Sequence, residues 1–243
     1  MKKNKELLFW GILISAVQIF MLLVDSIQFL EGEIYQPFKY LYGDGYDRAK
    51  FYALEQYMWL VNISLYCVMA VRKMIQCREE NSYFSIVRYS SLRRYYLSVY
   101  KSIVMYTAVY QAAVFSGALI GYCIVRAYRS VEGLNWYLLL MSQMLMLLGN
   151  FFFGVIMLYA ILHKDAVKWA VVLYPGIPVI ALLSKEYLPQ AVNNLIPGNW
   201  MMLARSREFC GGGFSIGMAV VLELAVFVVV SWRVIFKKKE KRR

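Results

Sequence analysis

Three carboxylates lie within or at the edge of apolar segments, where ionisable groups are rare. Asp25 and Glu55 lie near the ends of such segments, whereas Glu223 lies nine residues into the last one, about 13 Å along a helix that rises 1.5 Å per residue. A carboxylate at the bilayer centre costs about 2.5–3.5 kcal/mol on insertion scales. We expect Asp25 and Glu55 to reach water. Glu223 and Asp25 are candidates for polar groups that line a translocation path. The alternative for Glu223 is a structural role, in which its side chain forms a hydrogen bond between helices.

The motifs of several enzyme classes are missing from the sequence. No GxxxxGK[ST] loop occurs, so the chain has no phosphate-cradling loop of its own. His163 is the only histidine, which leaves no metal-ligand cluster and no Ser-His-Asp arrangement. The Glu79-Glu80 pair resembles the start of a glutamate-type intramembrane protease motif, but Phe84 stands where that motif needs arginine. We expect no catalytic residue, no metal site and no cofactor on this chain.

The elements that position these residues follow from composition. Hydrophobic residues make up 60% of the 243 positions and charged residues 17%, against about a quarter charged in soluble domains. Spanning a bilayer takes about 20 apolar residues, and the chain has six candidate segments, of which 53–71 and 166–183 are the weaker. The predicted fold is all-α, a single six-span membrane domain over residues 1–243 with spans at 7–30, 53–71, 103–125, 136–162, 166–183 and 214–235. The first segment is too long for a signal peptide, and we interpret it as a retained span.

The distribution of basic residues predicts the orientation. With six spans, both termini share one side, and that side holds 19 of the 27 Lys and Arg residues. Because positive residues concentrate in cytoplasmic loops, we place both termini and residues 78–101 in the cytoplasm. The net charge of +12 then reflects membrane topology, and we expect no nucleic-acid partner.

Two further features bear on packing. Gly117 and Gly121 have GxxxG spacing in the third predicted span, which permits close helix contact and suggests a dimer seam. In the last outer segment, residues 195–203 are apolar but too short to cross, so we expect partial helices with Trp200 at headgroup depth. The glycines at 211–213 are then expected to allow a sharp re-entry into the last span.

Residues 78–101 form a basic and aromatic interruption between the second and third predicted spans. This segment, which we call the platform, contains five Lys or Arg and five Tyr residues. Helical spacing places Tyr83, Phe84 and Val87 on one face. A break with Ser91 as N-cap then precedes a second apolar face that leads into the third span. An amphipathic helix that rests on anionic lipid is the simplest interpretation, although it does not explain the aromatic residues on both sides of the break.

The platform resembles a known family. Residues 86–97, IVRYSSLRRYYL, look like the segment between the second and third spans of ABC-2 type transporter permeases, and most closely those of bacterial peptide export or bacteriocin (lantibiotic) immunity. Residues 196–202, IPGNWMM, look like the outer loop of that subset. The six spans, the cytoplasmic termini and the long last outer loop agree with it in layout.

The resemblance implies a division of labour. A separate ABC ATPase subunit binds ATP and Mg, and the permease inserts a cytoplasmic coupling helix into it. Carried over to this sequence, the coupling contacts are Tyr83, Phe84, Ile86 and Val87, with Arg88, Arg93 and Arg94 pairing to acidic groups or lipid phosphates. A second permease chain, identical or not, completes the pathway, and the location is the bacterial cell membrane.

Two functions stay open from the sequence. The first is a permease subunit that moves an amphipathic or hydrophobic substrate, such as a peptide or a lipid-like molecule, across or out of the membrane. The second is a non-transporting membrane sensor or immunity protein that binds a peptide through its outer loops. Binding of an ATPase to the platform separates the two.

Overall fold

The computed structural model of the protein is helical in the parts of the chain that it describes. These are residues 2–27, 38–42, 53–79, 92–131, 133–161, 176, 179–184, 187–207 and 212–236. The helices are α1 Lys2–Ile27, α2 Lys39–Tyr42, α3 Ala53–Glu79, α5 Leu92–Arg126, α6 Trp136–Ile161, α8 Gln190–Asn193 and α9 Ile216–Phe236, with 3-10 turns η1 Pro197–Met201 and η2 Leu203–Arg205. An isolated bridge between Ser206 and Phe214 is the only β-type pairing among these residues. The predicted all-α class is confirmed.

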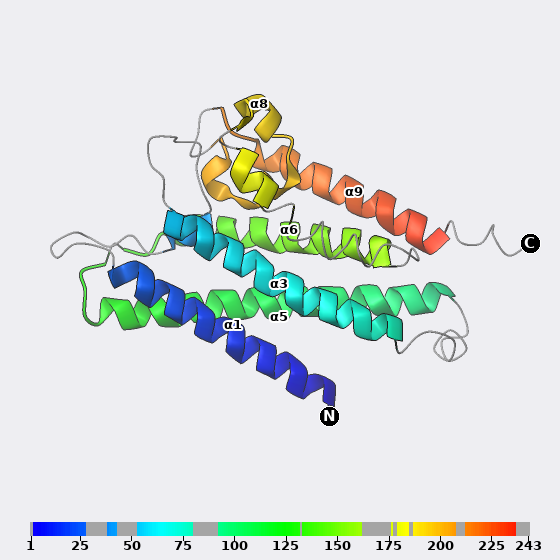
Figure 1. Ribbon diagram of the computed structural model, residues 1–243, viewed down its shortest axis with the longest axis horizontal. Helices are drawn as coiled ribbons and strands as arrows, with labels where there is room; N and C mark the ends of the chain where they lie inside the picture. The colour runs from blue at the N-terminus through cyan, green and yellow to red at the C-terminus, as the bar shows by residue number, and fades with distance from the viewer. Residues whose placement is uncertain are drawn as a thin grey trace, which may run out of the picture.

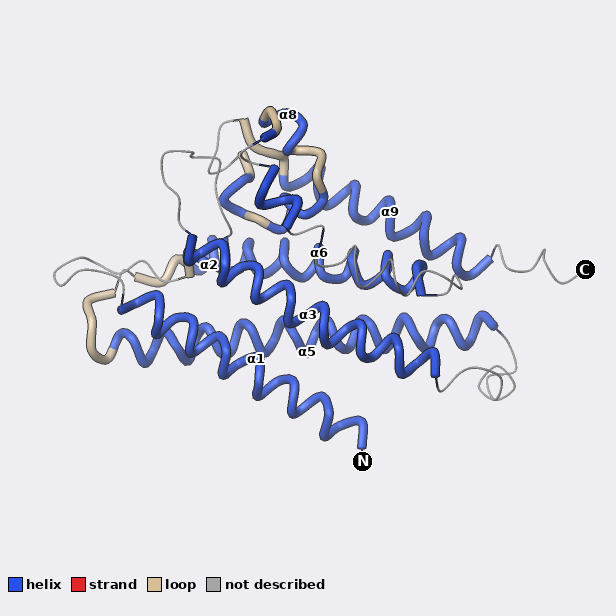
Figure 2. The backbone as a smooth tube through the Cα atoms, viewed as in Figure 1, coloured by secondary structure: helices blue, strands red, loops and turns tan. Residues whose placement is uncertain are grey.

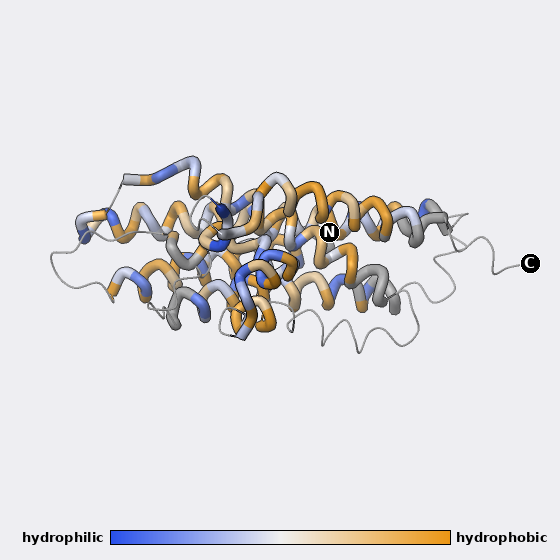
Figure 3. The backbone as a smooth tube through the Cα atoms, turned by 90° about the horizontal axis from the view of Figure 1, so that it is seen from above, coloured by the Kyte–Doolittle hydropathy of each residue, from blue (hydrophilic) through white to orange (hydrophobic). Residues whose placement is uncertain are grey.

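The five long helices form a bundle in which α6 contacts the most partners (Figures 1 and 2). Helix α1 packs chiefly along α5, while α6 packs against α3, α5 and α9. The N-terminal end of α1 and the C-terminal ends of α3 and α9 lie toward the same end of the bundle, where α5 begins (Figure 1). Apolar residues run along the long helices (Figure 3), and large apolar side chains such as Phe20, Leu140 and Val221 are exposed.

Among the described residues, three helices are long and apolar enough to cross a membrane, by length and composition: Lys5–Ile27, Leu97–Arg126 and Trp136–Ile156. These correspond to the predicted spans at 7–30, 103–125 and 136–162. Helix α3 has the length, with 27 residues, but carries polar residues such as Gln56 and Asn62 inside the predicted span. Helix α9 contributes a shorter apolar stretch, Ile216–Val229, and most of the predicted span 166–183 lies outside the described residues. Six spans therefore stay a prediction.

Helix α5 continues without interruption from the platform into a candidate span. Its 35 residues extend about 52 Å at 1.5 Å per residue, whereas a hydrocarbon core is about 30 Å thick. The predicted second platform helix and the third predicted span are thus one helix. Ser91, the predicted N-cap, lies outside the described residues.

The GxxxG pair of α5 packs within the chain. A Cβ atom at Gly117 would lie 2.6 Å from the backbone oxygen and 2.7 Å from the Cα of Ser15 on α1, and one at Gly121 would lie 3.0 Å from Leu22. Ser15 also donates a hydrogen bond from its hydroxyl to the Ala113 carbonyl, 3.0 Å away. The prediction of a dimer seam at this pair is therefore wrong, because α1 occupies the face that a second chain would need.

The segment that the sequence analysis places last on the outer side folds into a compact unit over α6 and α9, which we call the cap and define as residues 187–207 and 212–214. Its core consists of Trp200, Leu203 and Phe214 against Leu145 of α6 and Ala219 of α9. The predicted partial helices are present as α8, η1 and η2. A Cβ atom at Gly213 would lie 2.3 Å from the Arg205 carbonyl oxygen, so this glycine allows a close backbone approach.

Candidate functional site

Most predicted coupling residues fall in a part of the chain that the structure does not describe. Tyr83, Phe84, Ile86, Val87 and Arg88 lie outside the described residues. Arg93 and Arg94 lie in the first turn of α5, and the Arg94 side chain is exposed. The structure therefore places two members of the predicted set at the beginning of the long helix that leaves the platform.

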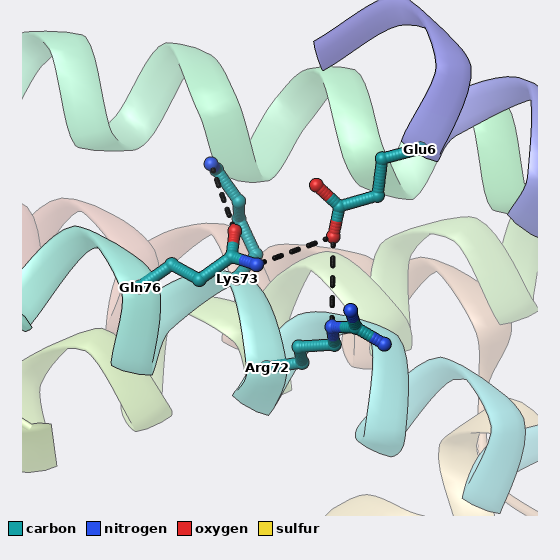
Figure 4. Close-up of polar contacts among 4 residues, drawn as sticks. All are labelled: Glu6, Arg72, Lys73 and Gln76. Atoms are coloured by element: carbon teal, nitrogen blue, oxygen red, sulfur yellow. Dashed lines mark hydrogen bonds and ion pairs between the residues drawn. The ribbon is translucent and has the colours of Figure 1, made fainter. Parts of the chain in front are cut away.

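A polar contact joins α1 to α3 near the same end of the bundle. The Glu6 carboxylate on α1 lies 3.7 Å from the Arg72 guanidinium and accepts a 3.5 Å hydrogen bond from the Gln76 amide, both on α3 (Figure 4). Lys73 in turn donates to the Gln76 side-chain oxygen at 3.4 Å. Because the Arg72 side chain is 59% exposed, this contact adds little to stability, but it ties α1 to the helix that leads into the platform.

The two predicted path carboxylates lie on different sides of the bundle. Asp25 is only 4% exposed, so the expectation that it reaches water is wrong. The end of α1 packs against α5 there, and the Ser26 and Tyr128 hydroxyls lie 3.0 Å apart. Glu223 is also 4% exposed and lies on the face of α9 that turns inward, one helical turn from Phe227. Since α1 packs on α5 and α3 while α9 packs on α6 and α5, the structure does not bring Asp25 and Glu223 together.

A band of neutral polar side chains crosses the interior of the bundle. This polar seam consists of Gln18 on α1, Trp59, Asn62 and Tyr66 on α3, Thr107, Tyr110 and Gln111 on α5, and Gln143 and Asn150 on α6. Its members are more than nine-tenths buried. Through Gln18, Gln111 and Asn150 it passes through all three candidate membrane spans.

Side-chain hydrogen bonds in the seam join neighbouring helices. The Gln18 amide donates to the side-chain oxygen of Asn62, and the Gln111 amide donates to that of Gln143. The Tyr110 hydroxyl donates to the Asn62 carbonyl at 2.6 Å. The Tyr66 and Thr107 hydroxyls lie 2.8 Å apart. These bonds connect α1 to α3, α3 to α5, and α5 to α6.

The seam also contains buried polar atoms without a protein partner. They are the indole nitrogen of Trp59, the amide nitrogens of Asn62 and Gln143, the amide oxygen of Gln111 and both amide atoms of Asn150. A buried polar atom without a hydrogen bond costs about 1–3 kcal/mol, and a whole domain is stable by only about 5–15 kcal/mol. The cost of six such atoms without hydrogen bonds is comparable to the stability of a whole domain. A ligand that forms hydrogen bonds with them would remove that cost, so the seam is a candidate binding site.

Comparison with protein-family models, with curated proteins and with solved structures finds no match. The seam, the cap and the platform are therefore interpreted from their own residues. Sequence reasoning missed the seam because it weighed only ionised groups inside the apolar segments. The signal was present, since Gln18, Asn62, Gln111, Gln143 and Asn150 all interrupt apolar runs.

The cap has a different kind of polar interior. Asn193, Asn194 and Asn199 each donate a side-chain N–H to a backbone carbonyl, at 3.0, 2.7 and 2.6 Å respectively. The fully buried Arg205 donates to the Ala181 carbonyl at 2.6 Å and to the Asn199 side-chain oxygen at 2.5 Å. Arg205 thereby ties the cap to residues 179–184, the described part of the fifth predicted span.

Trp200 lies inside the cap, and its predicted place at headgroup depth stays a prediction. Its indole N–H donates to the Asn194 carbonyl at 2.8 Å, and its ring centroid lies 6.5 Å from that of Phe152 on α6. Tyr187, Val192 and Leu195 are exposed in its place, with Tyr187 at 80%. The outer surface of the cap is therefore partly apolar at residues that the sequence analysis did not single out.

Proposed function

We propose that the chain is the transmembrane permease subunit of an ATP-binding cassette transporter. It moves an amphipathic or hydrophobic substrate, of which a peptide is the preferred class, across or out of the bacterial cell membrane. A separate ATPase subunit supplies the energy through the platform, and a second permease chain completes the complex. The membrane character of α1, α5 and α6 supports this proposal, as does the missing phosphate-binding loop in the sequence.

One observation supports the proposal above the others, namely the length of helix α5, which begins in the platform and contains a candidate span. Helix α5 has 35 residues, which correspond to about 52 Å, while a hydrocarbon core is about 30 Å thick. The candidate span within α5 begins only at Leu97, so the helix start with Arg93 and Arg94 extends beyond it. Rigid helices that project from the membrane are suited to transmit force from a bound partner.

Glu223 remains the candidate for a polar group along the substrate path. It is buried on α9, next to Phe227, whose ring lies 6.3 Å from that of Tyr100 on α5 and 5.1 Å from that of Phe151 on α6. Tyr100 belongs to the platform. The ring cluster therefore connects the helix of Glu223 to the helix that would receive force from the ATPase.

Co-purification with the ATPase encoded beside the gene tests the proposal. The tagged wild-type chain should retain the ATPase, and the double variant Phe84→Asp/Val87→Asp should lose it. The matched control is Val192→Asp/Leu195→Asp, which introduces the same charges on the exposed cap, and it should retain the ATPase. Loss of the ATPase with the control alone, or equal retention by all three chains, would contradict a coupling role for the platform.

The alternative, a sensor or immunity protein that binds a peptide outside, is favoured by the exposed apolar residues of the cap. A sensor needs no ATPase, so it predicts no co-purification with any of these chains. It also predicts that the cap variant, and not the platform variant, loses protection against the peptide.

A further inference from the structure

The open atoms of the polar seam lie on three helices, α3, α5 and α6. On α6, Gln143, Asn150 and Gly154 fall within about 40° of one another on a helical wheel of 100° per residue, so they share a face. Gly154 faces α3 and α5, since a Cβ atom there would lie 2.9 Å from the Tyr66 hydroxyl and 3.0 Å from Ile103. Asn62 lies one turn before Tyr66 on α3, and Asn150 lies one turn before Gly154 on α6. Asn150 therefore lies on the face of α6 that packs against α3 and α5.

The unpartnered atoms include both donors and acceptors. Trp59, Asn62, Gln143 and Asn150 present N–H groups, while Gln111 and Asn150 present amide oxygens. A metal cation would face N–H groups and find no carboxylate among these atoms, so the site does not suit it. An anion that carries no proton has no hydrogen to donate to the amide oxygens. The matching ligand is neutral, accepts hydrogen bonds and also donates them.

We propose that the polar seam is a binding site for buried water, centred on Asn150 between α3, α5 and α6. Asn62 and Asn150 have no exposed surface, so a ligand bound to them is enclosed by the protein, which favours a molecule as small as water. Buried waters in proteins typically make about three hydrogen bonds to polar groups that would otherwise be unsatisfied. Water at this position gives Asn150 an acceptor and a donor, and links α6 to α3 and α5 where direct side-chain bonds are incomplete. This inference does not depend on the proposed function.

Residence of water at Asn150 can be measured in the complete chain in lipid bilayers. The protein is labelled with ¹⁵N-asparagine, and proton-detected solid-state NMR records magnetisation transfer from water protons to each side-chain amide. The Asn150 signal is assigned with Asn150→Ser and, if that variant does not fold, by sequential backbone assignment of the wild type. The internal control is Asn199, which is equally unexposed but has both amide atoms bonded to protein.

The expected result is water transfer to the Asn150 amide several-fold stronger than to the Asn199 amide. Transfer to Asn150 that is no stronger than to Asn199 would overturn the proposal. The outcome is independent of whether an ATPase binds, so it is distinguishable from failure of the proposed function.

Discussion

The cap and the polar seam bury side chains of the same types, and they complete the hydrogen bonds of those side chains differently. In the cap, Asn199 has both amide atoms bonded to protein and Trp200 donates its indole N–H to a carbonyl. In the seam, Asn150 has neither amide atom bonded to protein, and the Trp59 indole N–H is without a protein partner. All four side chains are at most 6% exposed.

Backbone conformation explains the difference. In a regular helix each carbonyl already accepts a bond from the N–H four residues on, so a side chain between helices finds few free acceptors. The cap consists of short turns, and helix ends and turns leave backbone carbonyls open. Asn193, Asn194 and Trp200 use such carbonyls. The comparison indicates that protein groups complete the hydrogen bonds of Asn199 and Trp200, while Asn150 and the Trp59 indole N–H have no protein partner. The cap is not free of such atoms, since the Asn193 side-chain oxygen and the Ser206 hydroxyl are also buried without one.

The largest effect is expected from the cap arginine. Arg205→Met removes two charge-assisted hydrogen bonds and leaves the Ala181 and Asn199 oxygens bare, which should lower the free energy of unfolding by about 3–5 kcal/mol. Unfolding in mixed detergent micelles measures it. The control Arg207→Met, at an exposed arginine with a 3.2 Å bond to the Gly213 carbonyl, should have little effect. Similar losses for both variants would mean that the cap is not held by its buried bonds.

The next prediction compares the two asparagines directly. Asn199→Leu leaves the Asn193 carbonyl and Arg205 without their bonds, and should cost about 2–4 kcal/mol of unfolding free energy. Asn150→Leu removes no direct bond to protein and only bonds through the proposed water, so it should cost less unfolding free energy than Asn199→Leu. The two variants are unfolded under identical conditions. A greater loss from the Asn150 variant would reverse the comparison.

A smaller effect is expected at the close contact between α1 and α5. Gly117→Ala pushes a methyl group against the Ser15 backbone, which cannot rotate away, and should cost about 1–3 kcal/mol. Gly11→Ala serves as the control, because nothing lies within 4 Å of its added Cβ, and should stabilise α1 by up to about 1 kcal/mol. If Gly117→Ala changed the oligomeric mass and left stability unaffected, the glycine would belong to a dimer interface after all.

The smallest effect concerns the ion pair at the platform end. A double-mutant cycle of Glu6→Gln and Arg72→Gln should give a coupling energy below about 1 kcal/mol, because the pair is exposed. That energy should fall further as salt is raised. A coupling energy of several kcal/mol that does not change with salt would contradict this prediction. It would mean that the ion pair stabilises the contact between α1 and α3 as strongly as the buried hydrogen bonds stabilise the cap.

The sequence predicted the elements whose signal is local. Apolar runs located α1, α5, α6 and α9 to within a few residues at most ends, and the mixed composition of residues 184–213 indicated the partial helices of the cap. The exception at α5 is its start, since helical spacing alone did not reveal that the platform helix and the span are continuous. Orientation of the chain in a membrane stays a prediction.

The partners of side chains were harder to predict because they depend on packing between distant segments. The GxxxG spacing indicated a close helix contact, but not that α1 would be the partner instead of a second chain. Asp25 was expected to reach water, and tertiary packing covers it. The polar seam required knowing that Asn62, Gln111 and Gln143 meet inside one bundle, which no spacing within a single segment reveals.

The central claim is that the platform contacts an ATPase, and photocrosslinking from position 84 tests it most directly. A benzophenone amino acid is placed at Phe84 or, as the control, at the exposed cap residue Leu195, and the chain is irradiated in membranes with the neighbouring ATPase. The account predicts a covalent adduct with the ATPase from position 84 and none from position 195. An adduct from position 195, or none from position 84 when the ATPase is present, would contradict it.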